Sequence, residues 1–262
     1  RQKNDGPEII LIKSSIYQLI AGKKKAIREG IKISSGELII TTDADCRFSS
    51  EWIRIIAEYF IDNDIKLLTA PVTFHKSKNI FKSLQSLEFL SLIASAGGFI
   101  GAGKPILGNA SNLAFLKKSY LEAEKIRTDY DLASGDDIFL LYYIKKIYGA
   151  SKIGFLKNYN SVVITSAMNT LKELFSQRMR WVSKARKYKD PLIILTSWIT
   201  FLFNFSLFLG FMLSIAFNNL LHFFLLLLLI KILTDLPVMA GICYFTRRLK
   251  LLLLLIPLEL IN

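Results

Sequence analysis

Residues 37–45 of the chain read Glu-Leu-Ile-Ile-Thr-Thr-Asp-Ala-Asp. The run up to Thr42 is almost continuously apolar or β-branched, which is typical of a strand buried within a parallel sheet. Asp43 and Asp45 follow where this strand ends, and open α/β sheets bind ligands at the carboxyl ends of their strands. The stretch therefore predicts an α/β fold with a ligand site directly after a buried strand.

Strand-like and helix-like patterns alternate through residues 1–190, which predicts one α/β domain with a mixed sheet. A strand around residues 66–73 is expected to be broken by Pro71. A glycine-rich segment, residues 97–108, is expected to be a flexible loop or a close backbone approach. The other expected strands are residues 8–12, 112–116 and 152–165. The expected helices are residues 26–30 after a turn at 22–25, a helix capped by Ser49 or Ser50, residues 80–95, and a helix that residues 134–137 open and that runs to about residue 148.

Residues 191–262 are dominated by Leu, Ile and Phe and predict transmembrane helices at about 192–217 and 220–245, with an incomplete one at 249–262. Lys231 and Asp235 lie four residues apart, so their charges are expected to share one helix face and neutralise each other. Basic residues flank both complete spans on the side of the α/β domain, which predicts a multi-pass protein of the inner or plasma membrane with a cytoplasmic domain. Because the chain starts at Arg1 and its last apolar segment is short, we expect a fragment of a longer protein.

The chain carries a formal charge of +13. Such a charge is compatible with binding to nucleic acid, an anionic membrane surface or a phosphorylated small molecule. The adjacent apolar spans favour lipid headgroups and a diphosphate, and no nucleic acid partner is expected. The only cysteines are Cys46 and Cys243, and the only histidines are His75 and His222. So few of these residues argue against a disulfide framework, a Ser-His-Asp hydrolase and a histidine-rich zinc site.

Two acidic pairs each have a functional and a structural interpretation. Asp43 and Asp45 are hard ligands suited to Mg²⁺ or Mn²⁺ beside substrate phosphates, but an Asp-x-Asp triplet is also a common polar turn. Asp136 and Asp137 are expected at a helix start, where acidic residues complement the helix dipole. The alternative for this second pair is a general base that removes a proton from an acceptor hydroxyl.

A third group lies just before the first span. Gln177, Arg180 and Trp181 have helical spacing, so they are expected on one face, where a guanidinium and an indole suit a diphosphate and a sugar or base. The alternative is an interfacial belt of Trp and Arg at the membrane border. The lysine run that includes Lys23 is either a solvated charge run or a phosphate contact.

Taken in order, five segments resemble the family 2 glycosyltransferases, and more narrowly the membrane-attached group with cellulose synthase-like and ceramide glucosyltransferase-like enzymes. The segments are Gly22 to Ile27, Thr42 to Asp45, Gly108 to Phe115, Ser134 to Asp137 and Gln177 to Trp181.

The resemblance implies a GT-A (Rossmann-like) fold and an inverting displacement at the anomeric carbon of a nucleotide sugar, with a UDP-sugar as the first expectation. It implies that Asp45 is the chief ligand of Mg²⁺ or Mn²⁺ and that Asp43 contacts the metal or the donor nucleotide. It also implies that Asp137, with Asp136 beside it, is the catalytic base.

The same resemblance implies donor-binding roles for Lys23, Gln177, Arg180 and Trp181. The family's first strand, with its nucleobase-binding acid, has no counterpart here, and the glycine that often follows the tryptophan in polymer synthases is missing. A single transfer to a lipid, lipid-linked or glycan acceptor is therefore as compatible with the sequence as polymerisation. A different class of function, a non-catalytic membrane protein that binds anionic lipid through its basic region, stays open.

Overall fold

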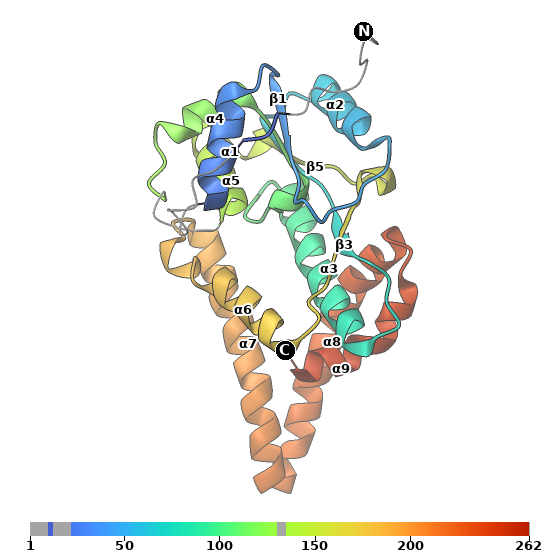
Figure 1. Cartoon of the computed structure of the whole chain (residues 1–262). Coiled ribbons are helices and arrows are strands. Elements are labelled where there is room, and N and C mark those ends of the chain that lie inside the picture. Colours follow the sequence, from blue (N-terminus) through green and yellow to red (C-terminus); the bar gives the residue numbers. More distant parts are fainter. Residues whose placement is uncertain (1–9, 13–21, 130–134, 262) are drawn as a thin grey trace.

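The computed structural model describes residues 10–12, 22–129 and 135–261, and Figure 1 shows an α/β domain above a stalk of two long helices. The domain holds a mixed four-stranded sheet, as the sequence predicts. Its strand order is β1-β4-β2-β5, with β4 antiparallel to both neighbours and β2 parallel to β5. The strands are β1 (Leu38–Thr41), β2 (Leu67–Thr69), β4 (Leu113–Leu116) and β5 (Ile153–Phe155).

A second, two-stranded parallel sheet pairs β3 (Val72–Phe74) with β6 (Val163–Thr165). Pro71 lies between β2 and β3, so the interruption predicted there is confirmed and it separates strands of two different sheets. The strand expected over residues 152–165 is likewise divided between β5 and β6. Of the strand expected at residues 8–12, Ile10 to Ile12 have no regular structure, and residues 8 and 9 lie outside the described residues.

Helices cover both faces of the larger sheet, which gives three layers (Figure 1). Along β1, Leu38 and Ile40 pack into one core and Ile39 packs into the other, as the alternation of side chains along a strand requires. The first core includes α2 (Trp52–Asp62) and α3 (Ile80–Gly101), and the second includes α1 (Gly22–Ile33), α4 (Lys117–Glu124) and α5 (Asp136–Tyr148).

The prediction that residues 37–42 form a buried parallel strand is wrong in two respects. Strand β1 is antiparallel to β4, its one described neighbour, and its residues are half-buried rather than buried. The continuous apolar run reflects contact with a core on each face, which antiparallel strands between two helical layers also require.

Helix α3 extends into the start of the glycine-rich segment, over residues 97–101, where a flexible loop was one of the two expectations. Gly97, Gly98 and Gly101 lie within this helix. A Cβ at Gly97 would lie 2.9 Å from the ring of Phe155, so the glycine lets α3 approach β5 closely. Close backbone approach, the other expectation for this segment, is therefore confirmed at Gly97.

Two helix starts also differ from expectation. The turn expected at residues 22–25 is the first turn of α1, since lysine is a good helix former. Helix α2 begins at Trp52 after Glu51, which makes no side-chain cap. The Ser49 hydroxyl accepts a hydrogen bond from the Glu51 amide and donates one to the Asn160 carbonyl, so it fixes the preceding loop.

Three described helices are long and apolar enough to cross a membrane: α3, α7 (Pro191–Ala216) and the helical segment Asn218–Phe245, which contains α8 (Leu221–Phe245). α7 and α8 form the stalk in Figure 1 and expose large apolar side chains along it. Much of α3 is instead buried within the domain, with Leu87 and Leu90 fully covered.

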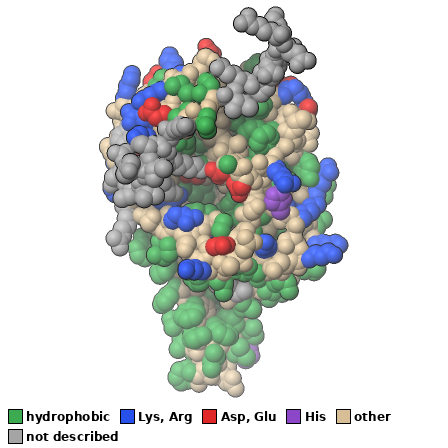
Figure 2. All heavy atoms as spheres, in the orientation of Figure 1, with side chains coloured by type: hydrophobic (Ala, Val, Ile, Leu, Met, Phe, Trp, Pro, Cys, Tyr) green, Lys and Arg blue, Asp and Glu red, His purple; other side chains and the backbone are tan. Residues whose placement is uncertain are grey.

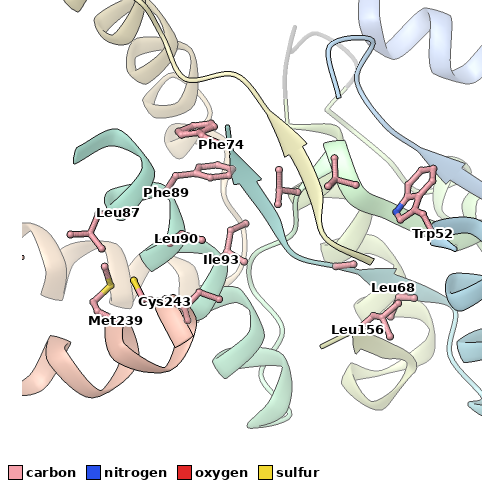
Figure 3. Close-up of a cluster of buried hydrophobic side chains, with 14 of the residues drawn as sticks. Trp52, Leu68, Phe74, Leu87, Phe89, Leu90, Ile93, Leu156, Met239 and Cys243 are labelled. Carbon is pink, nitrogen blue, oxygen red and sulfur yellow. The ribbon is translucent and has the colours of Figure 1, made fainter. Parts of the chain in front are cut away.

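The last apolar segment is not one continuous helix. A 3-10 helix, η6 (Leu249–Leu254), leads into the short helix α9 (Leu255–Ile261), and both contact α3 and α8. Leu255 and Leu258 join the first core, where Met239 and Cys243 of α8 meet Leu87 and its neighbours on α3 (Figure 3). The end of α8 and the α/β domain therefore share one core.

Candidate active site

The acidic loop after β1 presents Asp43 and Asp45 to two different elements. The Ser111 hydroxyl donates a short hydrogen bond to Asp43 Oδ2, and Thr165 Oγ1 donates to Asp45 Oδ2 at 2.8 Å. The period-two alternation of a strand would direct both side chains the same way. It does not apply to these two residues, because the chain turns at Ala44 and Asp45, where the Cys46 amide donates a hydrogen bond to the Asp43 carbonyl. Asp45 is exposed and Asp43 is half-buried, so both remain near solvent.

Asp136 and Asp137 stand in the first turn of α5, as predicted, although Ser134 of the same motif lies outside the described residues. The preceding Gly135 has φ +97°, and a Cβ there would lie 2.8 Å from carbons of Lys184 and Phe139. This position therefore requires glycine, since an L side chain would be strained and would clash.

The two aspartates of α5 have different surroundings. Asp136 lies 3.5 Å from Arg127 Nη2, and its pKa is raised chiefly by burial, which the charges of Lys24 and Arg127 partly oppose. Asp137 Oδ2 instead accepts a hydrogen bond of 3.2 Å from the Ala110 amide. The structure thus directs Asp136 toward a buried ionic cluster and Asp137 toward the short helix η1 (Ala110–Asn112).

Helix η1 brings two of the predicted site residues together. Asp137 accepts from the amide of Ala110, and Asp43 accepts from the hydroxyl of the next residue, Ser111. The Thr41 hydroxyl, at the end of β1, donates to the Ala110 carbonyl at 3.0 Å. Two acidic groups separated by about 90 residues in sequence are therefore anchored to consecutive residues of one turn.

A buried ionic cluster of Lys24, Arg127 and Asp129 adjoins Asp136. Lys24 Nζ is 2.7 Å from Asp129 Oδ2, and Arg127 Nη2 is 2.7 Å from the same oxygen. Burial works to raise the pKa of Asp129, but the hydrogen bonds from Arg127 and Lys24 outweigh it and hold the pKa below its usual value. Sequence inspection singled out Lys23, whose side chain lies outside the described residues, and missed the structural role of Lys24, for which the lysine run gave no signal.

The segment Gln177 to Trp181 lies in α6 (Leu171–Val182), which a capping box of Thr170 and Glu173 begins. Gln177 and Trp181 are half-buried, whereas Arg180 is exposed to solvent. It is Arg178 that stacks on Trp181, with its guanidinium carbon 4.3 Å from the ring centroid.

Arg178 also forms an ion pair of 2.5 Å with Glu88 of α3, which fastens α6 to the domain. Neither residue is among the site residues predicted from the sequence. The spacing of three residues between Arg178 and Trp181 was the available signal, since side chains three apart on a helix are neighbours.

Within the described residues, no group of three or more His, Cys, Asp or Glu side chains is placed to hold a metal. Asp45 and Asp43 nevertheless offer carboxylate oxygens, which suit Mg²⁺ or Mn²⁺. Mg²⁺ usually binds proteins through one or two carboxylates, with waters and substrate phosphates as the other ligands. The donor set therefore fits a metal that is shared with a phosphorylated substrate.

Residues 16–124 match the model of the family described as glycosyl transferase family 2. The matched segment includes Asp43 and Asp45 and ends before Asp136, Asp137 and α6. The chain has no significant match among curated proteins. Together with the mixed sheet and the acidic loop after β1, the match indicates a family 2 glycosyl transferase domain over residues 16–124.

Proposed function

We propose that the protein transfers a sugar, with inversion at the anomeric carbon, from a nucleotide sugar to a lipid, lipid-linked or glycan acceptor at the cytoplasmic face of a membrane. A UDP-sugar is the proposed donor. The observation that carries the proposal is the anchoring of Asp43 and Asp137 to consecutive residues of η1, beside Asp45, in a chain with a family 2 domain.

Asp45 and Asp43 would hold Mg²⁺ or Mn²⁺ in this proposal. A bound divalent cation neutralises charge that develops on a nucleoside diphosphate leaving group. Asp45 is the better placed of the two, because it is exposed and accepts only the Thr165 hydroxyl among the hydrogen bonds described for it. The bond from Ser111 to Asp43 would orient the second carboxylate.

Asp137 is the proposed catalytic base. Its carboxylate is held by the Ala110 amide at 3.2 Å and the Ile138 amide at 2.9 Å, so its orientation is fixed before substrate arrives. It would accept the proton of the acceptor hydroxyl as that oxygen attacks the anomeric carbon. Asp136, drawn toward Arg127, would position the start of α5 rather than touch substrate.

Helix α6 is the proposed cover of the donor site. Arg180 is exposed and available to bind a diphosphate. Gln177 and Trp181 belong to the same helix and are proposed to bind the donor with it. Lys23 is proposed to lie near the donor. In this division of the chain, residues 1–190 form the catalytic domain, and the remainder anchors it to the membrane with the basic flanks of α7 and α8 on the cytoplasmic side.

The proposal is tested with full-length protein in detergent, titrated with UDP with and without Mn²⁺ and assayed for transfer. Asp45→Ala should abolish the metal-dependent part of UDP binding. Asp137→Asn should reduce turnover by about 10²-fold or more, the scale of a lost general base, while UDP binding is retained.

Asp62→Asn and Asp62→Ala are the matched controls, because Asp62 is an exposed aspartate at the end of α2. Neither control should change binding or turnover. Equal loss of UDP binding in Asp45→Ala and Asp137→Asn would overturn the proposed division of roles. Folded protein that binds no nucleotide, with or without metal, would favour the non-catalytic lipid-binding alternative.

A further inference from the structure

A pocket of about 590 Å³ lies on the side of the domain that carries the two-stranded sheet. Its walls come from the loop before α2, from β3 and β6, from the short helix η3 (Tyr159–Ser161), and from the turn after α8. Figure 2 shows, on the face of the domain above the apolar stalk, a histidine and several Lys or Arg side chains close to an acidic group. The catalytic and donor-binding roles proposed above involve none of the basic residues that line this pocket.

The described lining of this pocket is basic. Arg47, His75, Lys76 and Arg248 contribute to it, and no Asp or Glu does. Among the described residues, no carboxylate oxygen lies within 4.0 Å of the basic nitrogens of these four side chains. A concave surface with charges of one sign raises the local concentration of ligands of the opposite sign.

Arg248 is only 9% exposed, although it is charged. It donates to the Ser86 hydroxyl at 3.1 Å and makes a short hydrogen bond to the Phe74 carbonyl, and both acceptors are uncharged. Burial lowers the pKa of Arg248, so the folded chain bears the cost of desolvating this cation. Buried charges in proteins are normally paired, and a ligand anion would supply the missing counterion.

A second buried group faces the same pocket. Thr73 is 3% exposed and lines the pocket, and its hydroxyl oxygen has no hydrogen-bond partner within the described part of the chain. Buried hydroxyls are almost always hydrogen-bonded. An acceptor oxygen of a bound ligand would satisfy it.

The turn after α8 is built to place Arg248. The Arg248 amide bonds to the Cys243 carbonyl at 2.7 Å, and Arg247 adopts φ +57° as the residue after the helix cap. Glycine is usual at such a position, because other residues are strained there. Arg247 is held by its stacking on Tyr159, 4.2 Å from guanidinium carbon to ring centroid, at the rim of the pocket.

The pocket connects the end of a stalk helix to the acidic loop. Arg47 follows Asp45 by two residues and forms a bridge with Ile164, next to the threonine that donates to Asp45. Thr246 and Arg248, at the opposite wall, directly follow α8. A ligand that enters from the membrane border would therefore lie beside the proposed metal ligand.

We propose that this pocket binds the phosphate group of a lipid-linked acceptor, through Arg47 and Arg248 with the Thr73 hydroxyl. The inference rests on the proposed function and narrows its acceptor to an anionic, phosphate-bearing lipid. Guanidinium groups match phosphate oxygens in charge and geometry, and the volume leaves space for the part of the acceptor adjoining the phosphate.

The test is calorimetric titration of the full-length protein in dodecyl maltoside with three probes: farnesyl phosphate, farnesol and inorganic phosphate. Farnesyl phosphate should bind at least tenfold more tightly than either of the others. Arg47→Gln should weaken it about tenfold, as expected for one charged hydrogen bond. Lys118→Gln, which removes an exposed charge on α4, is the matched control and should leave affinity unchanged.

Arg248→Gln should also weaken farnesyl phosphate binding. Because Arg248 is buried, this variant could fail to fold, and the exposed Arg47→Gln then tests the inference by itself. Equal affinity for farnesol and farnesyl phosphate, or no effect of Arg47→Gln, would overturn the inference. Inorganic phosphate binding as tightly as farnesyl phosphate would assign the site to free phosphate and refute the lipid acceptor. Competition by UDP would assign the pocket to the donor, which also refutes it.

The same samples separate this inference from the proposed function. Asp45→Ala should lose metal-dependent UDP binding and keep farnesyl phosphate binding. Metal-dependent UDP binding without any farnesyl phosphate binding would sink the pocket inference alone. Farnesyl phosphate binding without UDP binding would sink the proposed function.

Discussion

At the scale of single residues, Asn112 links three parts of the domain. Its side-chain oxygen accepts from Trp52 Nε1 at 3.0 Å, and its amide donates to the carbonyls of Pro71 and Ser161, both at 2.8 Å. It is fully buried, so its polar atoms have no access to water. It thereby holds α2, the β2–β3 link and η3 around η1, the turn that carries the proposed site.

Asn112→Ala should lower the free energy of unfolding by about 3 kcal/mol, because it leaves several buried polar groups unpaired. Thermal unfolding of the detergent-solubilised protein measures the change. Asn63→Ala is the matched control, since Asn63 is exposed at the end of α2 and its side-chain amide donates to the Tyr59 carbonyl within the same helix turn. A loss no larger than that of the control would contradict this role for Asn112.

Asp129 gives the domain a dependence on pH. Its pKa is below the usual value because hydrogen bonds from Arg127 and Lys24 outweigh the effect of burial. A carboxylate with a lowered pKa contributes stability that is present above its unfolded pKa, near 4, and is lost as the pH falls through the folded pKa. The Asp129 contribution should therefore disappear as the pH is lowered below about 4.

Unfolding free energies measured between about pH 6 and 3 should fall less steeply in Asp129→Asn than in the wild type. The variant should also be less stable at neutral pH, because Lys24 and Arg127 lose a charged partner. Asp62→Asn should keep the wild-type slope. Parallel curves for wild type and Asp129→Asn would refute this account.

At the scale of elements, the docking of α6 on α3 decides where the proposed donor cover lies. The Arg178–Glu88 ion pair joins the two helices, and Trp181 packs near Phe89 with ring centroids 6.4 Å apart. No residue of α6 itself is buried. The position of the helix therefore depends on this small set of half-buried contacts, which suits an element that moves with substrate.

Glu88→Gln should lower the free energy of unfolding by only about 1 kcal/mol, as expected for a half-exposed pair. Turnover should fall by more than this small destabilisation explains, because α6 would no longer be held in position over the proposed site. Turnover and thermal unfolding, measured on the same preparation, separate the two effects. Glu58→Gln, which breaks an exposed pair with Arg54 on α2, is the control.

Arg178→Lys gives a second test of this element, since it keeps the charge and loses the planar stacking on Trp181. It should reduce turnover in the same way as Glu88→Gln. Full activity in both variants would show that the contact does not position α6.

At the scale of the whole molecule, one lysine joins two helices of the apolar region. Lys231 of α8 lies 2.9 Å from Asp235, as the predicted neutralisation requires, and 2.8 Å from Glu259 of α9. The Glu259 side chain is 3% exposed and that of Lys231 is 12% exposed. Helical spacing could not predict Glu259 as a partner of Lys231, because the two residues lie 28 positions apart in the sequence.

Lys231→Met should destabilise the protein by about 3 kcal/mol or more, since Glu259 would be left buried without a counterion. The double variant Lys231→Met with Glu259→Leu should recover most of that loss, because it removes both charges. Thermal unfolding in detergent measures both. A double variant as unstable as the single one would show that the loss comes from packing rather than from the unpaired acid.

The sequence by itself determined the features that depend on local pattern. The alternation of strands and helices, the break at Pro71, the helix that starts at Asp136 and the apolar segments of α7 and α8 follow from periodicity, proline chemistry and length. The acidic loop after β1 could also be found, because it directly follows an apolar run.

Only the tertiary structure decided which side chains meet. The pairing of β1, the anchoring of Asp43 and Asp137 to one turn, and the burial of Lys24 against Asp129 join residues far apart in the chain. On α6, helical spacing admitted both Arg178 and Arg180, and the position of Glu88 selected Arg178 as the docking residue. Such contacts depend on how whole layers pack, because a local pattern fixes the face of an element but not the partner of that face.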